Sequence, residues 1–189
     1  ASVKIIDNVE SGASADRLVV PGVGALEQVL NEIRSRHFDD AIRDFCKSSK
    51  PLMGICVGMQ MLFDGSEEFG THAGLGVMPG TVKEVPKLTV DGLVQRVPHI
   101  GWSHLVEPEY GRDWGSTLLK PFVGQNPAFY FVHSFSAQPE KPEDRLADCM
   151  YGGRRICAAV QRGNVVATQF HPERSAEAGL DVVSAFLAL

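Results

Sequence analysis

Short apolar runs and amphipathic segments alternate along the first third of the chain. Residues 18–20 (LVV) and 52–55 (LMGI) are apolar runs of strand length. Apolar side chains recur at helical spacing through residues 25–33 and 38–46, and a third helix is predicted over residues 57–63. This order of strands and helices favours a parallel sheet with helices on both faces.

The rest of the chain has mainly strand patterns. Residues 80–83 and the aromatic run 128–136 each predict a strand. Residues 146–170 predict a meander with turns at Gly152-Gly153 and Gly163-Asn164. The predicted fold class is therefore α/β, with an open, mainly parallel sheet flanked by helices and with some antiparallel strands.

A last helix is expected over residues 176–189. Ser175 can cap its first turn. Its apolar face would comprise Leu180, Val183, Phe186 and Leu187.

Length and composition bound the possible functions. With 189 residues the chain fits a single domain over residues 1–189, and its 44% hydrophobic content can form a sizeable core. The formal net charge of −5 gives no indication of a nucleic-acid or anionic-membrane partner. No apolar run is long enough to span a bilayer and no signal segment begins the chain, so a cytoplasmic protein is expected.

The four cysteines indicate a reduced chain without a metal or other cofactor. They form no Cys-x-x-Cys pair, and no His/Cys cluster has zinc spacing. Cys149 and Cys157 lie in apolar runs and Cys46 lies in a helical pattern, where each is expected to be structural. Cys56 differs, because it stands between two glycines where a strand pattern meets a helix pattern.

Residues 54–58 (GICVG) have the Gly-x-nucleophile-x-Gly form of a strand-to-helix elbow. Such a turn strains the central backbone and leaves no space for side chains two residues to either side. It would project the Cys56 sulfur from the carboxyl edge of the sheet. The N-terminus of the next helix would then lower the thiol pKa and hold an oxyanion. A buried structural cysteine in a glycine-flanked turn is the alternative.

A cysteine nucleophile needs a base, and His171 is the strongest of six histidine candidates. It follows the apolar run 165–169, so it is expected at the same sheet edge as Cys56. Glu173 can hold one ring nitrogen and leave the other to take the thiol proton. Together the three predict acyl transfer through a thioester; alone, His171 could be a strand-end histidine beside a surface glutamate. Two further histidines in strand patterns fit either the core or a site, His99 and His133.

Longer motifs accompany this triad: PGVGA (21–25), GICVGMQ (54–60), SEE (66–68), PHIGW (98–102), YFVHSF (130–135) and FHPERS (170–175). The elbow and HPE resemble any class I glutamine amidotransferase. The full set resembles one family within that class, the glutaminase subunits of imidazole glycerol phosphate synthases. The resemblance runs from about residue 3 to the C-terminus.

The resemblance implies a role for each matched residue. Cys56 would attack the glutamine carboxamide, His171 would shuttle protons and Glu173 would orient His171. The oxyanion would be held by the Val57 amide and by the peptide between Gly22 and Val23, which in this family can need to flip before it donates.

The amino-acid end of glutamine would be held at positions that match the family's substrate residues, namely Gly24, Gln60, Glu68, Ser134 and Phe135. Phe135 replaces a Tyr that is common there, so a backbone contact would survive and a hydroxyl contact would not. Without the resemblance, Gln60 could be a solvated helix residue, Glu68 part of an acidic turn and Ser134 an edge-strand hydroxyl.

Ammonia released from glutamine is useful only if it stays unprotonated and out of water. The resemblance implies a partner that uses it, a (βα)8-barrel cyclase that forms a heterodimer with this chain in histidine biosynthesis. Trp102 and His99 match a strand near that interface, where an exposed Trp can anchor a partner. A core Trp is the alternative.

The family also has a first strand and helix before the segment that residues 3–16 match. The chain is therefore expected to lack them, either because the true start lies upstream or because this is a shortened variant. Two other functions stay open: a related amidotransferase subunit that serves another acceptor, and a catalytically silent interaction subunit.

Overall fold

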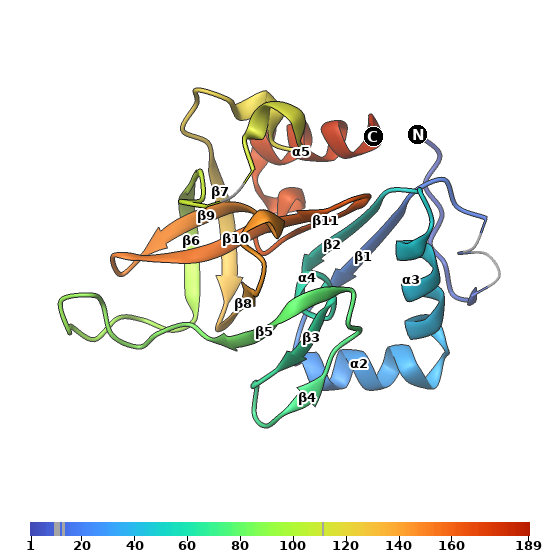
Figure 1. The fold of residues 1–189 in the computed structure, drawn as a ribbon, viewed down its shortest axis with the longest axis horizontal. Helices are drawn as coiled ribbons and strands as arrows, with labels where there is room; N and C mark the ends of the chain where they lie inside the picture. The colour runs from blue at the N-terminus through green and yellow to red at the C-terminus, as the bar shows by residue number, and fades with distance from the viewer. Residues whose placement is uncertain (10–11, 13, 111) are drawn as a thin grey trace.

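The computed structural model describes residues 1–9, 12, 14–110 and 112–189, and within them the chain forms one seven-stranded and one four-stranded sheet (Figure 1). The larger sheet has the order β1 (Leu18–Gly22), β2 (Leu52–Cys56), β11 (Val165–Thr168), β10 (Arg154–Arg162), β9 (Arg145–Tyr151), β6 (His99–Val106) and β7 (Ala128–His133). The smaller sheet has the order β4 (His72–Ala73), β3 (Phe63–Ser66), β5 (Met78–Glu84) and β8 (Phe135–Pro139).

The helices are α2 (Leu26–Ser35), α3 (Phe38–Lys47), α4 (Val57–Gln60) and α5 (Ala176–Leu187). Short 3₁₀ turns lie at η1 (Trp114–Ser116), η2 (Lys120–Phe122), η3 (Pro142–Asp144) and η4 (Pro172–Arg174). Residues 4–7 form no strand, and Ile5 is exposed.

Parallel pairing in the larger sheet is confined, among its described strands, to β1, β2 and β11. From β11 onward, β10, β9, β6 and β7 pair antiparallel. The α/β class is confirmed, but the parallel part is smaller than expected. Tight turns are the reason: Gly152, Gly153 and Gly163 have positive φ and close the hairpins β9–β10 and β10–β11, which requires antiparallel neighbours.

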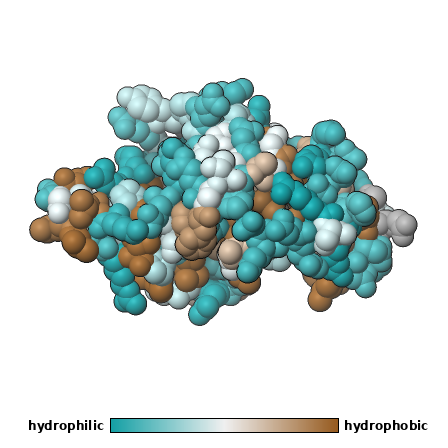
Figure 2. All heavy atoms as spheres, turned by 90° about the horizontal axis from the view of Figure 1, so that it is seen from below, coloured by the Kyte–Doolittle hydropathy of each residue, from teal (hydrophilic) through white to brown (hydrophobic). Residues whose placement is uncertain are grey.

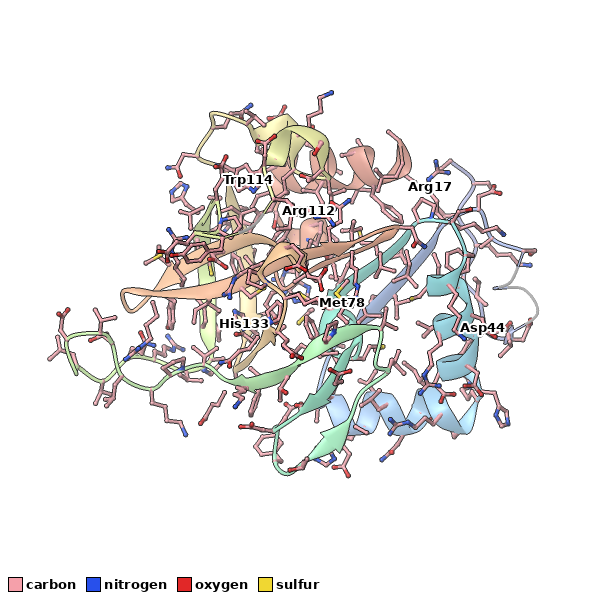
Figure 3. All side chains as sticks on the ribbon, viewed as in Figure 1. Arg17, Asp44, Met78, Arg112, Trp114 and His133 are labelled. Carbon is pink, nitrogen blue, oxygen red and sulfur yellow. The ribbon has the colours of Figure 1, made fainter. Side chains whose placement is uncertain are left out.

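Helices cover both faces of the sheet at its parallel end (Figure 1). On one face, α2 and α3 pack apolar side chains against Leu52 and Val165. On the other face, Met53 and Val166 pack with α5 and with the 3₁₀ segment that carries Trp114 (Figure 3). Neighbouring residues of β2 and β11 therefore point into opposite cores, which holds the ends of these strands firmly in place.

The helix predicted over residues 57–63 ends at Gln60, and Phe63 begins strand β3 instead. The cause is long-range backbone pairing. The Leu62 carbonyl accepts from the N–H groups of Val77 and Met78, at 2.8 and 2.9 Å. Similarly, the strand predicted over residues 128–136 divides into β7 and β8, which belong to different sheets.

The last helix is present, but its cap and its buried face differ from the prediction. The Ser175 hydroxyl donates to the His171 carbonyl at 2.6 Å and makes no cap hydrogen bond. The buried side of α5 contains Gly179, Val182 and Phe186, whereas Leu180 is exposed. The helix is turned about its axis so that Gly179 faces η4. Close contact requires this, because a Cβ on Gly179 would lie 1.8 Å from the Pro172 carbonyl oxygen.

Candidate active site

Cys56 ends β2 in a strained backbone conformation. Its φ of 55° and ψ of −111° are unusual for a residue with a side chain. Both flanking glycines are required by close packing: a Cβ on Gly58 would lie 1.9 Å from the Val20 carbonyl oxygen, and one on Gly54 would lie 2.7 Å from that of Gly58. The predicted strand-to-helix elbow is therefore confirmed, and it places the sulfur at the carboxyl edge of the sheet.

His171 reaches this edge from the neighbouring strand. β11 runs parallel to β2 with Ala167 opposite Gly54, and His171 follows shortly after its end. His171 Nδ1 lies 2.7 Å from Glu173 Oε1. His171 Nε2 is buried and has no hydrogen-bond partner among the described residues. The ring thus has one nitrogen held by a carboxylate and the other open to a proton.

Burial raises the pKa of the Cys56 thiol to about 11, against hydrogen bonds from the Val57 backbone and from Gln169 that lower it. The negative charges of Glu173 and Glu68 also raise this pKa. The prediction of a lowered thiol pKa is wrong for the free chain. α4 has four residues, so its dipole is small, and the buried thiolate would lose most of its hydration.

A cavity of about 440 Å³ opens beside the sulfur, and the predicted site residues line it. They are Cys56, His171 and Glu173, with Val23, Gly24, Val57, Gln60, Glu68, Ser134 and Phe135. Gly22 lines a smaller adjoining cavity of about 280 Å³ instead, which shares Val23, His171 and Glu173 with the first. The structure thus brings together residues that lie far apart in the sequence.

Glu68 links the cavity wall to the start of α2. Its Oε2 accepts a 2.8 Å hydrogen bond from the Leu26 N–H. Gly24, just before this point, has a φ of +93°, which favours glycine. Gly22 has a different requirement, since a Cβ there would lie 2.9 Å from the Gly58 nitrogen. The loop predicted to carry an oxyanion donor is therefore packed at one end and held by a carboxylate at the other.

Sequence reasoning missed Gln169, beside the sulfur, and Phe69, in the cavity wall, and it left His133 undecided. Gln169 is fully buried, and its Nε2 lies 3.6 Å from Cys56 Sγ. His133 lies at the junction of β7 and β8 (Figure 3), where its Nδ1 lies 2.9 Å from the Phe135 carbonyl oxygen. Phe69 packs edge-on against the Phe135 ring. The available signal for Gln169 was its place two residues before His171, on the same side of an extended strand end.

Of the two residues matched to a partner interface, only Trp102 is exposed, at 55%. His99 is 2% exposed and stacks on Phe131 and Tyr151. Its Nδ1 lies 3.1 Å from His133 Nε2. The side chain of His99 therefore points into the protein, and the place of its strand near a partner stays a prediction.

Burial lowers the pKa of both His99 and His133 to about 4, so the pair is neutral at pH 7. The four cysteines, all within the described part of the chain, form no disulfide. No three His, Cys, Asp or Glu side chains of the described residues are grouped as a metal ion would require. A membrane-spanning helix is likewise not found among these residues.

Comparison with known proteins gives consistent results. The family model for glutamine amidotransferase class-I matches residues 2–187. "Imidazole glycerol phosphate synthase subunit HisH 1" of Legionella pneumophila (strain Lens) is 46% identical over 189 residues, which are 100% of this chain and 88% of that protein. The HisH subunit of Rhodopirellula baltica is 42% identical over 185 residues, 97% of this chain and 83% of the relative.

Solved structures show the same fold at low identity. A crystal structure described as a glutamine amidotransferase superposes with a TM-score of 0.68 at 20% identity, covering 98% of this chain and 84% of the other. A structure of PurLQS from Thermotoga maritima gives a TM-score of 0.62 at 19% identity, over 92% and 79% of the two chains.

Proposed function

The chain belongs to the class I glutamine amidotransferase family, and on that basis we propose that it is the glutaminase subunit of an imidazole glycerol phosphate synthase. It is an enzyme that hydrolyses glutamine and supplies the ammonia for transfer. Relatives with the HisH name are 38–46% identical to it over nearly its whole length. The observation that carries the proposal is the strained Cys56 elbow, which shares one cavity with the His171–Glu173 pair.

The chemistry starts with deprotonation of the nucleophile. With a resting pKa of about 11, Cys56 is a thiol at neutral pH, so its attack on the glutamine carboxamide needs a base. His171 Nε2 takes the proton, while Glu173 holds Nδ1 and stabilises the imidazolium. The same Nε2 then protonates the amide nitrogen of the tetrahedral intermediate, whose C–N bond breaks to release neutral ammonia and leave a glutamyl thioester. A water molecule, activated in the same way, hydrolyses the glutamyl thioester to glutamate.

The developing oxyanion needs two donors. The Val57 N–H is one, because it follows the nucleophile directly and already hydrogen-bonds the sulfur. The other is the peptide between Gly22 and Val23, which lines the adjoining cavity and which the resemblance to the family assigns as a donor that can need to flip. A switch of this kind suits a protein that should release ammonia only when a partner is ready.

Glutamine is oriented by the opposite wall of the cavity. Glu68 keeps one carboxylate oxygen for the Leu26 N–H and directs its charge toward the substrate ammonium. Gln60 donates from Nε2 to the Phe135 carbonyl at 2.9 Å, which holds the backbone of residues 134–135 against the cavity. The substrate contacts on this side are made by backbone groups, and the Tyr-to-Phe difference at position 135 leaves these groups intact.

The ammonia goes to a (βα)8-barrel cyclase that forms a heterodimer with this chain in the cytoplasm. The relatives are named as subunits, which agrees with an acceptor site outside this chain. Trp102 is exposed on β6 and contacts the Tyr130 ring edge-on, and the Arg174 guanidinium lies over the same ring. A large, half-exposed aromatic residue of this kind is a suitable partner anchor.

The test is glutamate release from glutamine by the chain alone, with the barrel partner, and with the barrel partner plus its nucleotide ligand. We expect the rate to rise at each step. A barrel that activates hydrolysis but rejects the histidine-pathway nucleotide would instead identify a protein that serves another acceptor. No glutamate under any of these conditions would contradict the proposal and favour a silent interaction protein.

A further inference from the structure

A continuous series of buried hydrogen bonds leads to the nucleophile. Gln60 Nε2 lies 2.9 Å from the Phe135 carbonyl oxygen and 3.0 Å from Gln169 Oε1. Gln169 Nε2 in turn lies 3.6 Å from Cys56 Sγ. On the far side, His133 Nδ1 also meets the Phe135 carbonyl. The side chains of Gln60, Gln169, Cys56 and His133 are all buried.

One atom determines which group donates and which accepts in each hydrogen bond of this series. The Phe135 carbonyl oxygen can only accept, so the group of Gln60 that faces it must be the NH₂. The second hydrogen of that NH₂ points at Gln169, so Gln169 must present its oxygen there. The NH₂ of Gln169 is thereby turned toward the Cys56 sulfur. Neither amide can flip without leaving a buried donor or acceptor unpaired, which costs more than the hydrogen bond itself gains.

We propose that Gln169 is a catalytic residue whose amide N–H stabilises the Cys56 thiolate and fixes its direction, with Gln60 as the positioning residue that holds this amide in place. The inference rests on the proposed role of Cys56 as nucleophile and extends it. In this arrangement the thiolate has a side-chain donor that is present before substrate binds and that needs no reorganisation.

The physical reason is the change in charge on sulfur. A hydrogen bond from a neutral amide to a thiol is weak, whereas the same bond to a thiolate is charge-assisted and roughly twice as strong. Gln169 therefore favours the charged state, and its contact with the sulfur lowers the thiol pKa against the effect of burial. Proton transfer to His171 is made easier to the same extent.

The experiment measures alkylation of Cys56 by iodoacetamide in the full-length chain, across a range of pH, with peptide mass spectrometry to separate the four cysteines. The test variant is Gln169→Met, which keeps the length of the side chain and removes its donor. Loss of a hydrogen bond to a charged group reduces the thiolate population about tenfold. The greater nucleophilicity of a more basic thiolate offsets part of this, so the rate at a fixed pH falls about threefold to tenfold.

Gln161→Met is the matched control. Gln161 is also a buried glutamine, on neighbouring β10, and no hydrogen bond joins it to the sulfur. Its variant should alkylate at the wild-type rate. Glu173, Glu68, His171 and His133 face the same cavity and are unchanged in both variants, so their charges do not account for a difference.

Equal rates for wild type and folded Gln169→Met at every pH would overturn the inference. Should Gln169→Met fail to fold by circular dichroism, Gln60→Met carries the test, since it frees the Gln169 amide to turn away. Here a wild-type alkylation rate would overturn the inference as well. Alkylation needs neither glutamine nor a partner, so its result does not depend on glutaminase activity. A chain without glutaminase activity would contradict the proposed function and would leave the alkylation result unchanged.

Discussion

Cys56 and Cys157 lie two strands apart in one sheet, on β2 and β10, and both are buried. Burial raises the pKa of both thiols, to about 11 and about 12. Their surroundings differ. Cys56 ends a parallel strand at a strained turn and lines a cavity that contains His171, whereas Cys157 lies inside an antiparallel strand and faces the Ala159 carbonyl oxygen. Burial is common to both cysteines, so what distinguishes Cys56 is its position at a strand end beside a cavity.

The same contrast holds for the two halves of the larger sheet. In the parallel half, formed by β1, β2 and β11, the carboxyl ends of the strands meet at one edge and bring Cys56 and His171 together. In the antiparallel half, successive strands run in opposite directions, so their carboxyl ends do not gather at one edge. The residues of this half build the core and the outer wall of the cavity. The junction of β7 and β8 supplies that wall through His133, Ser134 and Phe135.

An arm at residues 85–97 extends from this second half and carries Leu88, Val90, Leu93 and Val94 as exposed apolar side chains. Figure 2 shows apolar side chains at the corresponding end of the molecule. The parallel half thus carries the Cys56 elbow, and the antiparallel half carries the exposed apolar side chains of the arm.

The largest expected difference is between the two cysteines themselves. Cys56→Ala should lower partner-activated glutamate release by at least about 10⁴-fold, because the thioester route is lost. Cys157→Ala should leave kcat unchanged and lower the free energy of unfolding by about 1 kcal/mol, through lost core contacts. Steady-state kinetics and urea unfolding of both variants check this. A comparable loss of kcat in Cys157→Ala would contradict the distinction between a reactive Cys56 and a structural Cys157.

Alanine substitutions of two glycines should give the next largest effect, on the free energy of unfolding. In Gly58→Ala the new Cβ would meet the Val20 carbonyl oxygen, so the elbow must open, and we expect a loss of more than about 3 kcal/mol in the free energy of unfolding. Gly163 in the β10–β11 turn has a φ of +57° and open space around it. Gly163→Ala should cost only about 1 kcal/mol, from backbone conformation alone. Urea unfolding that ranks these two variants in the opposite order would contradict the packing argument.

The buried histidines make the antiparallel half sensitive to acid. The pKa of His133 is about 4 in the folded chain and near 6.5 when unfolded, so below pH 6.5 the unfolded state binds a proton that the folded state does not. Stability is therefore unaffected above pH 6.5 and falls as the pH drops toward 4. His133 alone should cost about 2 kcal/mol between pH 6.5 and pH 5, and His99 acts in the same direction.

Unfolding in urea at closely spaced pH values measures this loss. His133→Gln should flatten the dependence between pH 6.5 and pH 5, since its side chain does not titrate in that range. An equally steep fall in the variant would assign the acid sensitivity to other groups.

The smallest effect concerns the exposed face of β6. Trp102→Ala should weaken binding of the barrel partner about tenfold, as expected for an aromatic anchor. It should change the stability of the isolated chain by less than about 1 kcal/mol, because about half of the side chain is already exposed. His104→Ala on the same strand is a matched control, since that exposed side chain bonds the Asn126 carbonyl within this chain. Calorimetric titration with unchanged affinity for Trp102→Ala would place the partner on another face.

Features set by neighbouring residues were predictable from the sequence. The elbow followed from Gly54, Cys56 and Gly58, because its steric requirements are local. The pairing of His171 with Glu173 followed from their separation by a single proline. These are the parts of the site in which a short motif specifies its own geometry.

Features set by distant residues were not predictable in this way. The helix after Cys56 ends at Gln60 because residues 74–78 take the backbone bonds of the next turn. The thiol pKa is raised because segments from the whole chain bury the sulfur. Gln169 was missed for a related reason. An uncharged amide has no motif of its own, and the orientation of the Gln169 amide depends on a hydrogen bond from Gln60, which lies 109 residues earlier.

The nucleophile can be identified by mass spectrometry of the complex with the barrel partner plus its nucleotide, quenched in acid during glutamine turnover. We expect a glutamyl adduct on the peptide that contains Cys56, absent from Cys56→Ala and from the peptides of Cys46, Cys149 and Cys157. Glutamate release without any adduct, or an adduct on another cysteine, would contradict the assignment of Cys56 as the nucleophile.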